Sequence, residues 1–404
     1  SAPTPWDTGE TPGLATKGHN VKLTHIAITN WRNFAHIEFD LSSRLFVVGP
    51  NSSGKTNLLG ALRFLGDIGR RGLVAASEDL GGPDRYFRSG ADSAAFVATF
   101  NDTQNSTEFA LFLRLMSAGS ESTKRGSDAD QTFAFPMTDP LTGEPNDRYL
   151  DVHQTITAGG KKPADEGESF PVEDEEAQRT RVRQTLAGIR YIHPNPKKML
   201  ERSDRYDPDH GTGFFQHVGR FSDQQLDAVV DRIRPIMASV VPEIPNLSYQ
   251  RMGLGTEVVF YSDTPVRGAS GVYSHEQFSE GTLRLLGMLF DLATLPRDTS
   301  VVLIEEPETF LQASVVRSLP SLLAEVAMNR DVQMVISTHS PELIDSELVL
   351  PSQVLMLRSE NGETTGELLS ESNDPRIKAV VSAGLPKSQG IDAVNGRTIP
   401  LGTW

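Results

Sequence analysis

Short apolar runs separated by polar segments dominate the chain and predict a mixed α/β fold. Continuous apolar runs at 301–304 and 332–336 are typical of strands buried on both faces of a parallel sheet. Another apolar run, at 44–48, leads directly into a glycine-rich loop. Apolar positions at helical spacing predict helices at 57–69, 222–241, 280–295 and 314–329.

Alternating apolar and polar residues predict antiparallel sheet in the first half of the chain. The alternation starts at 21–34 and recurs in several strand-like runs between 91 and 160, which breaker-rich segments separate. Residues 247–252 and 256–262 predict a β-hairpin. Near the C-terminus we expect a strand at 352–358, a partner around 366–370 and a short helix at 375–385. No heptad pattern is sustained, which excludes a long coiled coil.

Composition narrows the class of protein. The net charge of −15 means that a phosphate backbone is not attracted to the molecule as a whole, so any nucleic-acid contact must be a local patch. The chain has no cysteine, which excludes disulfides and thiolate metal sites. No apolar stretch reaches the roughly 18 residues that span a bilayer, and the N-terminus lacks a signal pattern. We expect a cytoplasmic protein without membrane contact.

The glycine-rich loop after the first apolar strand fits a phosphate-binding motif. Gly49–Thr56 reads G-x-x-x-x-G-K-[ST] and lies between a predicted strand and a predicted helix. In such a loop the backbone N–H groups surround the phosphates, a lysine reaches the β- and γ-phosphates, and a hydroxyl binds Mg²⁺. The alternative is a glycine-rich turn that carries a lysine. We expect ATP and Mg²⁺ as ligands, with these contact residues: Asn51, Ser52, Ser53, Gly54, Lys55, Thr56 and Asn57.

Two carboxylates follow the apolar run at 301–304. Glu305 and Glu306 would lie at the C-terminal end of a buried strand, where open α/β sheets bind ligands. One acid suits Mg²⁺ and the next can orient and deprotonate an attacking water. The alternative is an acidic first helical turn, since Pro307 follows.

Two further segments carry polar residues at the predicted ends of elements. His339, within 337–341, follows the next apolar strand and could reach a γ-phosphate, or it could be a bystander in a helix cap. Ser279 and Gly281 open the helix at 280–295. Their hydroxyl and bare N–H groups could face an anion, or Ser279 could simply cap the helix.

Taken in this order, the four motifs resemble the ABC-type ATPases of the RecF, SMC and OLD group. GPNSSGKT resembles the Walker A motif, FSEGTLR the signature, VVLIEEPE the Walker B motif and STHSPELI the switch-histidine motif. The resemblance covers 21–70 and 275–358. It implies a P-loop NTPase head of α/β class, with a mixed or parallel core sheet, an antiparallel β lobe and a helical insertion.

The resemblance also implies roles and partners. Glu306 would be the catalytic base, Glu305 and Thr56 would hold Mg²⁺, Lys55 would act in catalysis, and His339 would sense the γ-phosphate. Two subunits would dimerise head to tail, or form a higher assembly, with Ser279 and Gly281 of one closing over ATP held by the other. A partner effector such as a nuclease, in phage defence of the Septu type or in DNA repair, is implied by analogy.

The chain differs from the family pattern at several positions. Glu305 stands where the Walker B motif usually has Asp, and 311–313 replaces a Leu-His-Pro run that is frequent in OLD-like members. No glutamine marks the Q-loop, for which His193 or Asn195 are the nearest candidates.

The resemblance also suggests how the chain divides. We expect a flexible arm at 1–20, one ATPase domain at 21–358 with an insertion at about 91–270, and a C-terminal extension at 359–404, too short for a Toprim domain.

A basic segment at 179–205 is a candidate contact for nucleic acid or an acidic partner. The alternative is a solvated surface whose charge is offset by the acidic loop before it. The cations of the segment are Arg179, Arg181, Arg183, Arg190, Lys197, Lys198, Arg202 and Arg205.

Three functions compete at this stage. The first is an ATPase whose turnover opens and closes a dimer, as the two adjacent carboxylates favour. The second is a scaffold clamped by ATP, with little turnover. The third, a cytosolic subunit of a membrane transporter, fits poorly, because the wide spacing of the phosphate loop and the acid pair exceeds what a transporter module needs.

Overall fold

The structure is a computed structural model that describes residues 21–81, 83–91, 93–103, 107–117, 133–138, 145–158, 175–253, 257–262, 273–360 and 362–395. The arm expected at 1–20 and most of the acidic loop at 158–178 lie outside these residues. No helix in the described ranges is long and apolar enough to cross a membrane.

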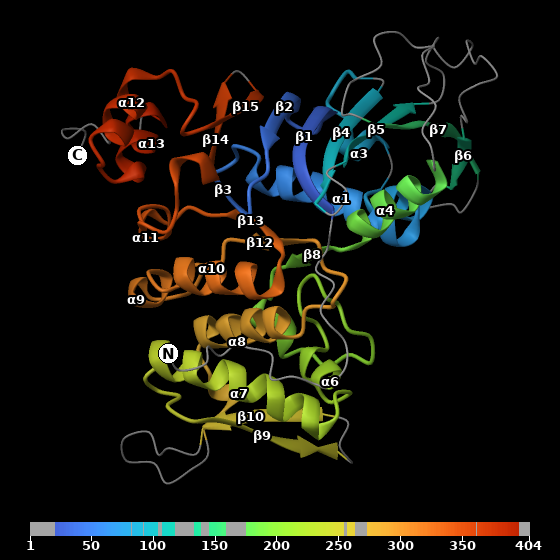
Figure 1. Ribbon diagram of the computed structural model, residues 1–404. Helices are drawn as coiled ribbons and strands as arrows, with labels where there is room; N and C mark the ends of the chain where they lie inside the picture. The colour runs from blue at the N-terminus through green and yellow to red at the C-terminus, as the bar shows by residue number, and fades with distance from the viewer. Residues whose placement is uncertain are drawn as a thin grey trace, which may run out of the picture.

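A six-stranded sheet of mixed direction forms the centre of the molecule (Figure 1). Its strand order is β15-β14-β3-β13-β12-β8, and all neighbours are parallel except β14 and β15. The apolar runs identified in the sequence supply its inner strands, as expected for a sheet covered on both faces. The strands are β3 (Arg44–Val48), β8 (Ile189–Ile192), β12 (Val301–Glu305), β13 (Gln333–Ser337), β14 (Val354–Glu360) and β15 (Glu363–Leu368).

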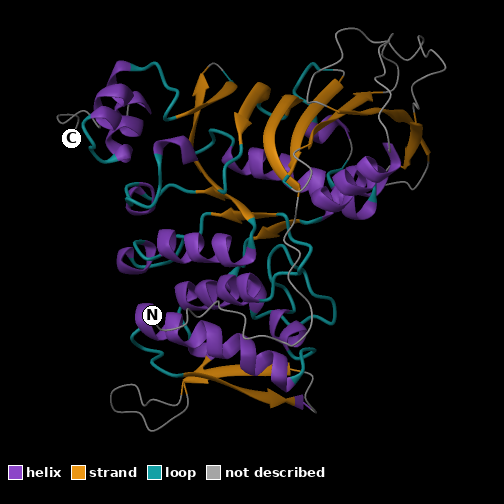
Figure 2. Cartoon of the chain, viewed as in Figure 1, coloured by secondary structure: helices purple, strands orange, loops and turns teal. Residues whose placement is uncertain are grey.

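Two antiparallel sheets lie on either side of this centre (Figure 2). The larger has the order β2-β1-β4-β5-β7-β6, and the predicted hairpin of 247–262 forms most of the smaller, β11-β10-β9. The strands are β1 (Val21–Trp31), β2 (Phe34–Asp40), β4 (Ser93–Asp102), β5 (Thr107–Ser117), β6 (Phe133–Thr138), β7 (Pro145–Ala158), β9 (Leu247–Met252), β10 (Glu257–Ser262) and β11 (Tyr273–Ser274).

Helices fill the two spaces between the sheets. Between the central sheet and the larger antiparallel sheet lie α1 (Lys55–Arg71) and α4 (Glu175–Ala187), whereas α7 (Asp223–Val240), α8 (Glu280–Ala293) and α10 (Leu319–Arg330) cover the opposite face (Figure 1). The shorter helices are α2 (Leu73–Asp79), α3 (Pro83–Tyr86), α5 (Pro196–Met199), α6 (Phe214–Val218), η3 (His275–Gln277), α9 (Ala313–Val316), α11 (Pro341–Ile344), η4 (Pro351–Gln353), α12 (Pro375–Ser382) and α13 (Lys387–Asn395).

The central sheet therefore separates two hydrophobic cores, and β12 shows how. Val301 and Leu303 pack into the core that contains α1, while Val302 and Ile304 pack into the core that contains α8. Side chains alternate along a strand, so the next residue, Glu305, faces the α1 side.

Some elements differ from the sequence prediction. The helix expected at 314–329 is two helices, α9 and α10, because Pro320 lacks an N–H and lies in the first turn of the second helix. Helix α13 and strand β8 were not predicted. β8 has only four residues and alternates weakly, so periodicity alone does not reveal it.

Candidate functional site

The glycine-rich loop connects β3 to α1 and closes around its own lysine. The Lys55 ammonium donates to the carbonyl oxygens of Gly49 at 2.9 Å and Pro50 at 3.0 Å. Gly54, at the start of α1, has a φ of +97°, and a Cβ there would lie 2.3 Å from the Asn33 amide nitrogen. Only glycine fits this left-handed, crowded position.

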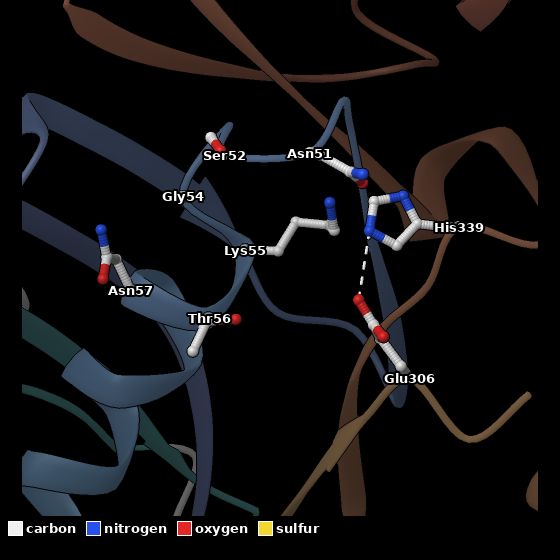
Figure 3. Close-up of a pocket in the computed structure, with 8 residues that line it drawn as sticks. All are labelled: Asn51, Ser52, Gly54, Lys55, Thr56, Asn57, Glu306 and His339. Carbon is white, nitrogen blue, oxygen red and sulfur yellow. Dashed lines mark ion pairs between the residues drawn. The ribbon is translucent and has the colours of Figure 1, made fainter. Parts of the chain in front are cut away.

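A cavity of about 650 Å³ opens over this loop. Side chains from three neighbouring parallel strands meet there, because the C-terminal ends of β3, β12 and β13 lie at one edge of the sheet. Figure 3 shows the Lys55 side chain extending toward His339, with Glu306 beside that histidine. The lining residues are Asn51, Ser52, Gly54, Lys55, Thr56, Asn57, Glu306 and His339.

Glu306 and His339 form an ion-pair contact, with His339 Nε2 3.1 Å from Glu306 Oε1 (Figure 3). The hydroxyl of Thr309 donates to the second carboxylate oxygen of Glu306 at 3.2 Å. Glu306 has a left-handed φ of +43°, which a non-glycine residue adopts at some cost. Its N–H donates to the carbonyl of Ser337 at 3.0 Å, so β13 holds this unusual turn in place.

Unlike Glu306, Glu305 does not line the cavity and is buried, with 9% of its surface exposed. Its Oε1 accepts a hydrogen bond from the Thr56 hydroxyl, and its Oε2 accepts one from the Tyr191 phenol. Burial and the neighbouring Glu305 carboxylate raise the pKa of Tyr191 well above its usual value, so the phenol remains a donor. A hydroxyl and a carboxylate are hard oxygen donors, which fits Mg²⁺.

Two residues that sequence reasoning missed fix the loop after β12. Arg284, on α8, is buried and donates to the carbonyl oxygens of Glu305 at 2.8 Å and Glu306 at 3.1 Å. Glu308 accepts from the Thr338 hydroxyl and the His339 N–H, both at 2.7 Å. Burial raises the pKa of Glu308, and these hydrogen bonds oppose the rise. The last glutamate of the EEPE run was the only sequence signal for the Glu308 contacts.

Ser279 and Gly281 do not line this cavity. Ser279 is exposed at the start of α8, where its hydroxyl accepts from the Thr282 N–H at 3.1 Å. Gly281 is buried against the loop after β12, and a Cβ on it would lie 2.2 Å from the carbonyl oxygen of Phe310. Ser53, also expected at the nucleotide, is buried within the phosphate loop rather than on the cavity wall.

The two candidates for the Q-loop position lie just after β8. His193 Nδ1 is 3.3 Å from the carbonyl oxygen of Glu305, and burial, with a smaller effect of Arg284, lowers its pKa. Asn195 instead caps α5, since its side chain accepts from the N–H groups of Lys197 and Lys198. Neither residue lines the cavity.

The basic segment is spread over α4, β8 and α5, and many of its cations have partners within the chain. Arg181 pairs with Asp102 at 2.9 Å. Arg202 pairs with Glu257 at 2.8 Å. The side chain of Arg179 lies outside what the structure describes. Further contacts are Arg190 with Asp298, Lys197 with Glu280 and Lys198 with Glu201.

Comparisons with known proteins agree with this architecture. The family model described as "AAA domain, putative AbiEii toxin, Type IV TA system" matches residues 45–345. The DNA replication and repair protein RecF of Rhizobium meliloti (strain 1021) is 38% identical over 71 residues, which are 17% of this chain and 19% of that protein. The match thus spans about a fifth of that relative.

Solved structures show a similar fold at low sequence identity. An SMC head bound to the C-winged helix domain of ScpA has a TM-score of 0.50 and 12% identity, covering 86% of this chain and 97% of that one. The SMC head domain from Thermotoga maritima has a TM-score of 0.47 and 14% identity, covering 86% and 98%. Since the family model spans most of the chain, the protein belongs to this AAA-domain family, and the matches to RecF and to an SMC head support the expected resemblance to the RecF and SMC group.

Proposed function

We propose that this protein binds ATP with Mg²⁺ in the cavity above the phosphate loop and hydrolyses it. One observation carries the proposal: the cavity brings Lys55 and the loop to the same space as Glu306 and His339. These residues come from the ends of three strands that are far apart in sequence. A lysine, a carboxylate and an imidazole that meet over a phosphate loop suit phosphoryl transfer to water.

In this proposal each residue has a distinct task. Lys55 and the loop amides bind the phosphates, while Thr56 and Glu305 hold Mg²⁺, which when bound neutralises charge on the phosphate oxygens. Glu306 accepts a proton from the attacking water as the water oxygen bonds to the γ-phosphorus. The bond from that phosphorus to the bridging oxygen breaks, and ADP leaves with the electron pair. His339, in contact with Glu306, orients the carboxylate and reads the γ-phosphate.

We also infer that the active form is a head-to-tail dimer or an assembly built from such dimers. Ser279 is exposed and outside its own subunit's cavity, which suits contact with ATP held by a second subunit. The start of α8 would present a hydroxyl and N–H groups to the γ-phosphate.

The proposed biological setting is a process that involves DNA, in phage defence or repair, with an effector such as a nuclease as partner. The support is the name of the RecF relative, a DNA replication and repair protein, and the solved SMC head with ScpA bound to it. With a net charge of −15, nucleic acid would meet a local surface, for which 179–205 is the candidate.

A second candidate function, an ATP-dependent clamp with slow turnover, is favoured by one contact. Both carboxylate oxygens of Glu306 are engaged, by His339 and by Thr309. A base whose lone pairs are partly occupied has fewer positions left for the attacking water, which would slow hydrolysis relative to binding.

Replacing Glu306 by Gln tests the proposal. The amide keeps the shape of the side chain but cannot accept the proton, so single-turnover hydrolysis should fall by about 10²–10⁴-fold. ATP binding should survive because Lys55, Thr56 and the loop amides are intact. The variant should then accumulate with uncleaved ATP as a dimer or larger assembly, measured by light scattering with and without ATP-Mg²⁺.

Two further variants separate the functions of the site. Glu305→Gln should weaken Mg²⁺ binding, so ATP is held less tightly and no ATP-locked assembly builds up. Lys55→Ala should abolish measurable ATP binding in calorimetry. Hydrolysis at the wild-type rate by Glu306→Gln would place the base elsewhere, and near-normal ATP affinity of Lys55→Ala would overturn the nucleotide site. A wild type that binds ATP but turns over only very slowly would support the clamp.

A further inference from the structure

The edge strand β8 brings a phenol to the acid expected at the metal. Tyr191 is paired with Leu303 of β12, so its side chain lies on the same face of the sheet as Leu303 and Glu305. That face carries α1, which begins at the phosphate loop. The Tyr191 hydroxyl donates to Glu305 Oε2, and the Thr56 hydroxyl donates to Oε1.

Each oxygen of the Glu305 carboxylate thus has its own donor from a different element. A glutamate has one more rotatable bond than the aspartate usual at this position, so more freedom must be removed to hold its carboxylate still. A single donor leaves the carboxylate free to rotate about that contact. Two donors, one from α1 and one from β8, fix both its position and its plane.

The Tyr191 ring itself has two neighbours, Arg63 and His193. The guanidinium of Arg63, on α1, lies over the ring, 5.2 Å from its centroid, and forms an ion pair with Asp209. On the same strand end, the His193 ring is stacked near that of Tyr191, with centroids 6.1 Å apart and 25° between the planes. The phenol is therefore pre-positioned by α1 and by the loop that carries Asp209.

We propose that Tyr191 is a positioning residue for the Mg²⁺ site, and that it acts by locking the Glu305 carboxylate against Thr56. This inference rests on the proposed function, because it concerns how the same site binds its metal. It implies that Thr56 always donates its proton to Glu305, which leaves the oxygen lone pairs of Thr56 for the cation. Groups that orient metal ligands in this way typically contribute 10- to 100-fold to metal affinity or activity.

The test is Tyr191→Phe, which removes the hydroxyl and keeps the ring. The probe is a fluorescent, non-hydrolysable ATP analogue, whose Kd is measured in EDTA and again at saturating Mg²⁺. The ratio of the two values reports how strongly the metal improves nucleotide binding. We expect this ratio to fall by about tenfold or more in the variant, while the Kd in EDTA stays at the wild-type value because Lys55 and the loop amides are unchanged.

Tyr249→Phe is the matched control. Its phenol also donates to a carboxylate, Asp227 at 2.8 Å, but it lies on β9, in the smaller sheet away from the cavity. This variant should keep the wild-type ratio. An unchanged ratio in Tyr191→Phe, with a wild type that does respond to Mg²⁺, would overturn the role of Tyr191 alone. A wild type whose nucleotide binding ignores Mg²⁺ would instead overturn the proposed metal site. A loss of binding in EDTA by Tyr191→Phe would show a structural role, and would also refute the inference.

Discussion

Glu305 and Glu306 are neighbours of the same type with opposite surroundings. Glu305 is buried and accepts hydrogen bonds from two hydroxyl groups, whereas 35% of the Glu306 side chain is exposed beside the cavity. In a regular strand the two carboxylates would point to opposite faces of the sheet, whereas the left-handed turn at Glu306 changes the direction of the chain, and Glu306 lines the cavity. Two identical side chains can therefore take different tasks, one at the metal and one at water.

Residue chemistry in the sequence predicted only part of this arrangement. The loop Gly49–Thr56, the acid pair and His339 could be recognised because each follows an apolar strand directly. Tyr191 could not, because it lies 114 residues from Glu305 in sequence and meets it only through strand pairing. Arg284 looked like one charge on an apolar helix, and its ties to the backbone of Glu305 depend on the packing of α8.

A half-buried acid on α8, Asp291, gives a further prediction for a single residue. Burial raises the pKa of Asp291 to about 7, and a hydrogen bond from the Tyr206 phenol, at 3.3 Å, only partly opposes this. The unfolded chain has a pKa near 4 at this group. Between about pH 4 and 7 the folded state therefore binds more protons than the unfolded state, so the free energy of unfolding falls as pH rises.

Asp291→Asn removes this ionisable group and should change that pH dependence. The variant should be more stable than the wild type at pH 8, by about 1–3 kcal/mol, with a smaller difference near pH 5. Urea unfolding at pH 8 and pH 5 measures the free energy of unfolding of the variant and of the wild type under both conditions. An equal difference at both values would show that Asp291 is already ionised in the folded protein.

At the scale of elements, long apolar runs were predictable and short or composite elements were not. The runs at β12 and β13 were predicted as buried strands, whereas their order against β3 was not predicted. β8 and the division between α9 and α10 depend on tertiary contacts and on one proline. The sequence also did not predict the contact between α8 and the loop after β12, because Gly281 was assigned only to the signature motif.

That contact predicts a structural effect of Gly281 that is separate from any nucleotide contact. Gly281→Ala would place a Cβ 2.2 Å from the Phe310 carbonyl oxygen, which is backbone and cannot move aside easily. We expect a loss of about 1–3 kcal/mol in the free energy of unfolding. Gly60→Ala, on α1, is the matched control, since its Cβ would meet only the Arg32 side chain, at 3.8 Å.

Gly60→Ala should be neutral or stabilising by up to about 1 kcal/mol, because alanine favours helix. Denaturant unfolding without nucleotide measures both variants. Equal stability of the two would mean that the approach of α8 to Phe310 is looser than the structure has it.

At the scale of the whole molecule, the central sheet separates the elements that we expect to bind ATP from those that we expect to meet a second subunit. One core carries α1 and the phosphate loop, and the other carries α8 with Ser279 at its exposed start. Arg284 ties α8 to the end of β12, where Glu305 and Glu306 lie. The acid pair is therefore in direct contact with the helix that we expect to meet a second subunit.

The composite site predicts that Ser279→Arg prevents ATP-dependent assembly. In the Glu306→Gln background, where ATP is not cleaved, a bulky cation at Ser279 should block closure over the partner's nucleotide and leave ATP binding within each subunit unchanged. Light scattering with ATP-Mg²⁺ should then report monomers, whereas Glu306→Gln alone reports the assembly.

Loss of the Ser279 helix cap could by itself lower the stability of the protein, so the control variant must also remove a helix cap. Ser222 caps α7 as Ser279 caps α8, since its hydroxyl accepts from the Gln225 N–H at 3.3 Å. Ser222→Arg should cost a similar amount of stability, about 1 kcal/mol, because the same kind of cap is removed. It should nevertheless leave ATP-dependent assembly intact in the Glu306→Gln background. If both variants still assemble with ATP, the start of α8 is not part of the interface, and if both fail, capping rather than a composite site explains the loss.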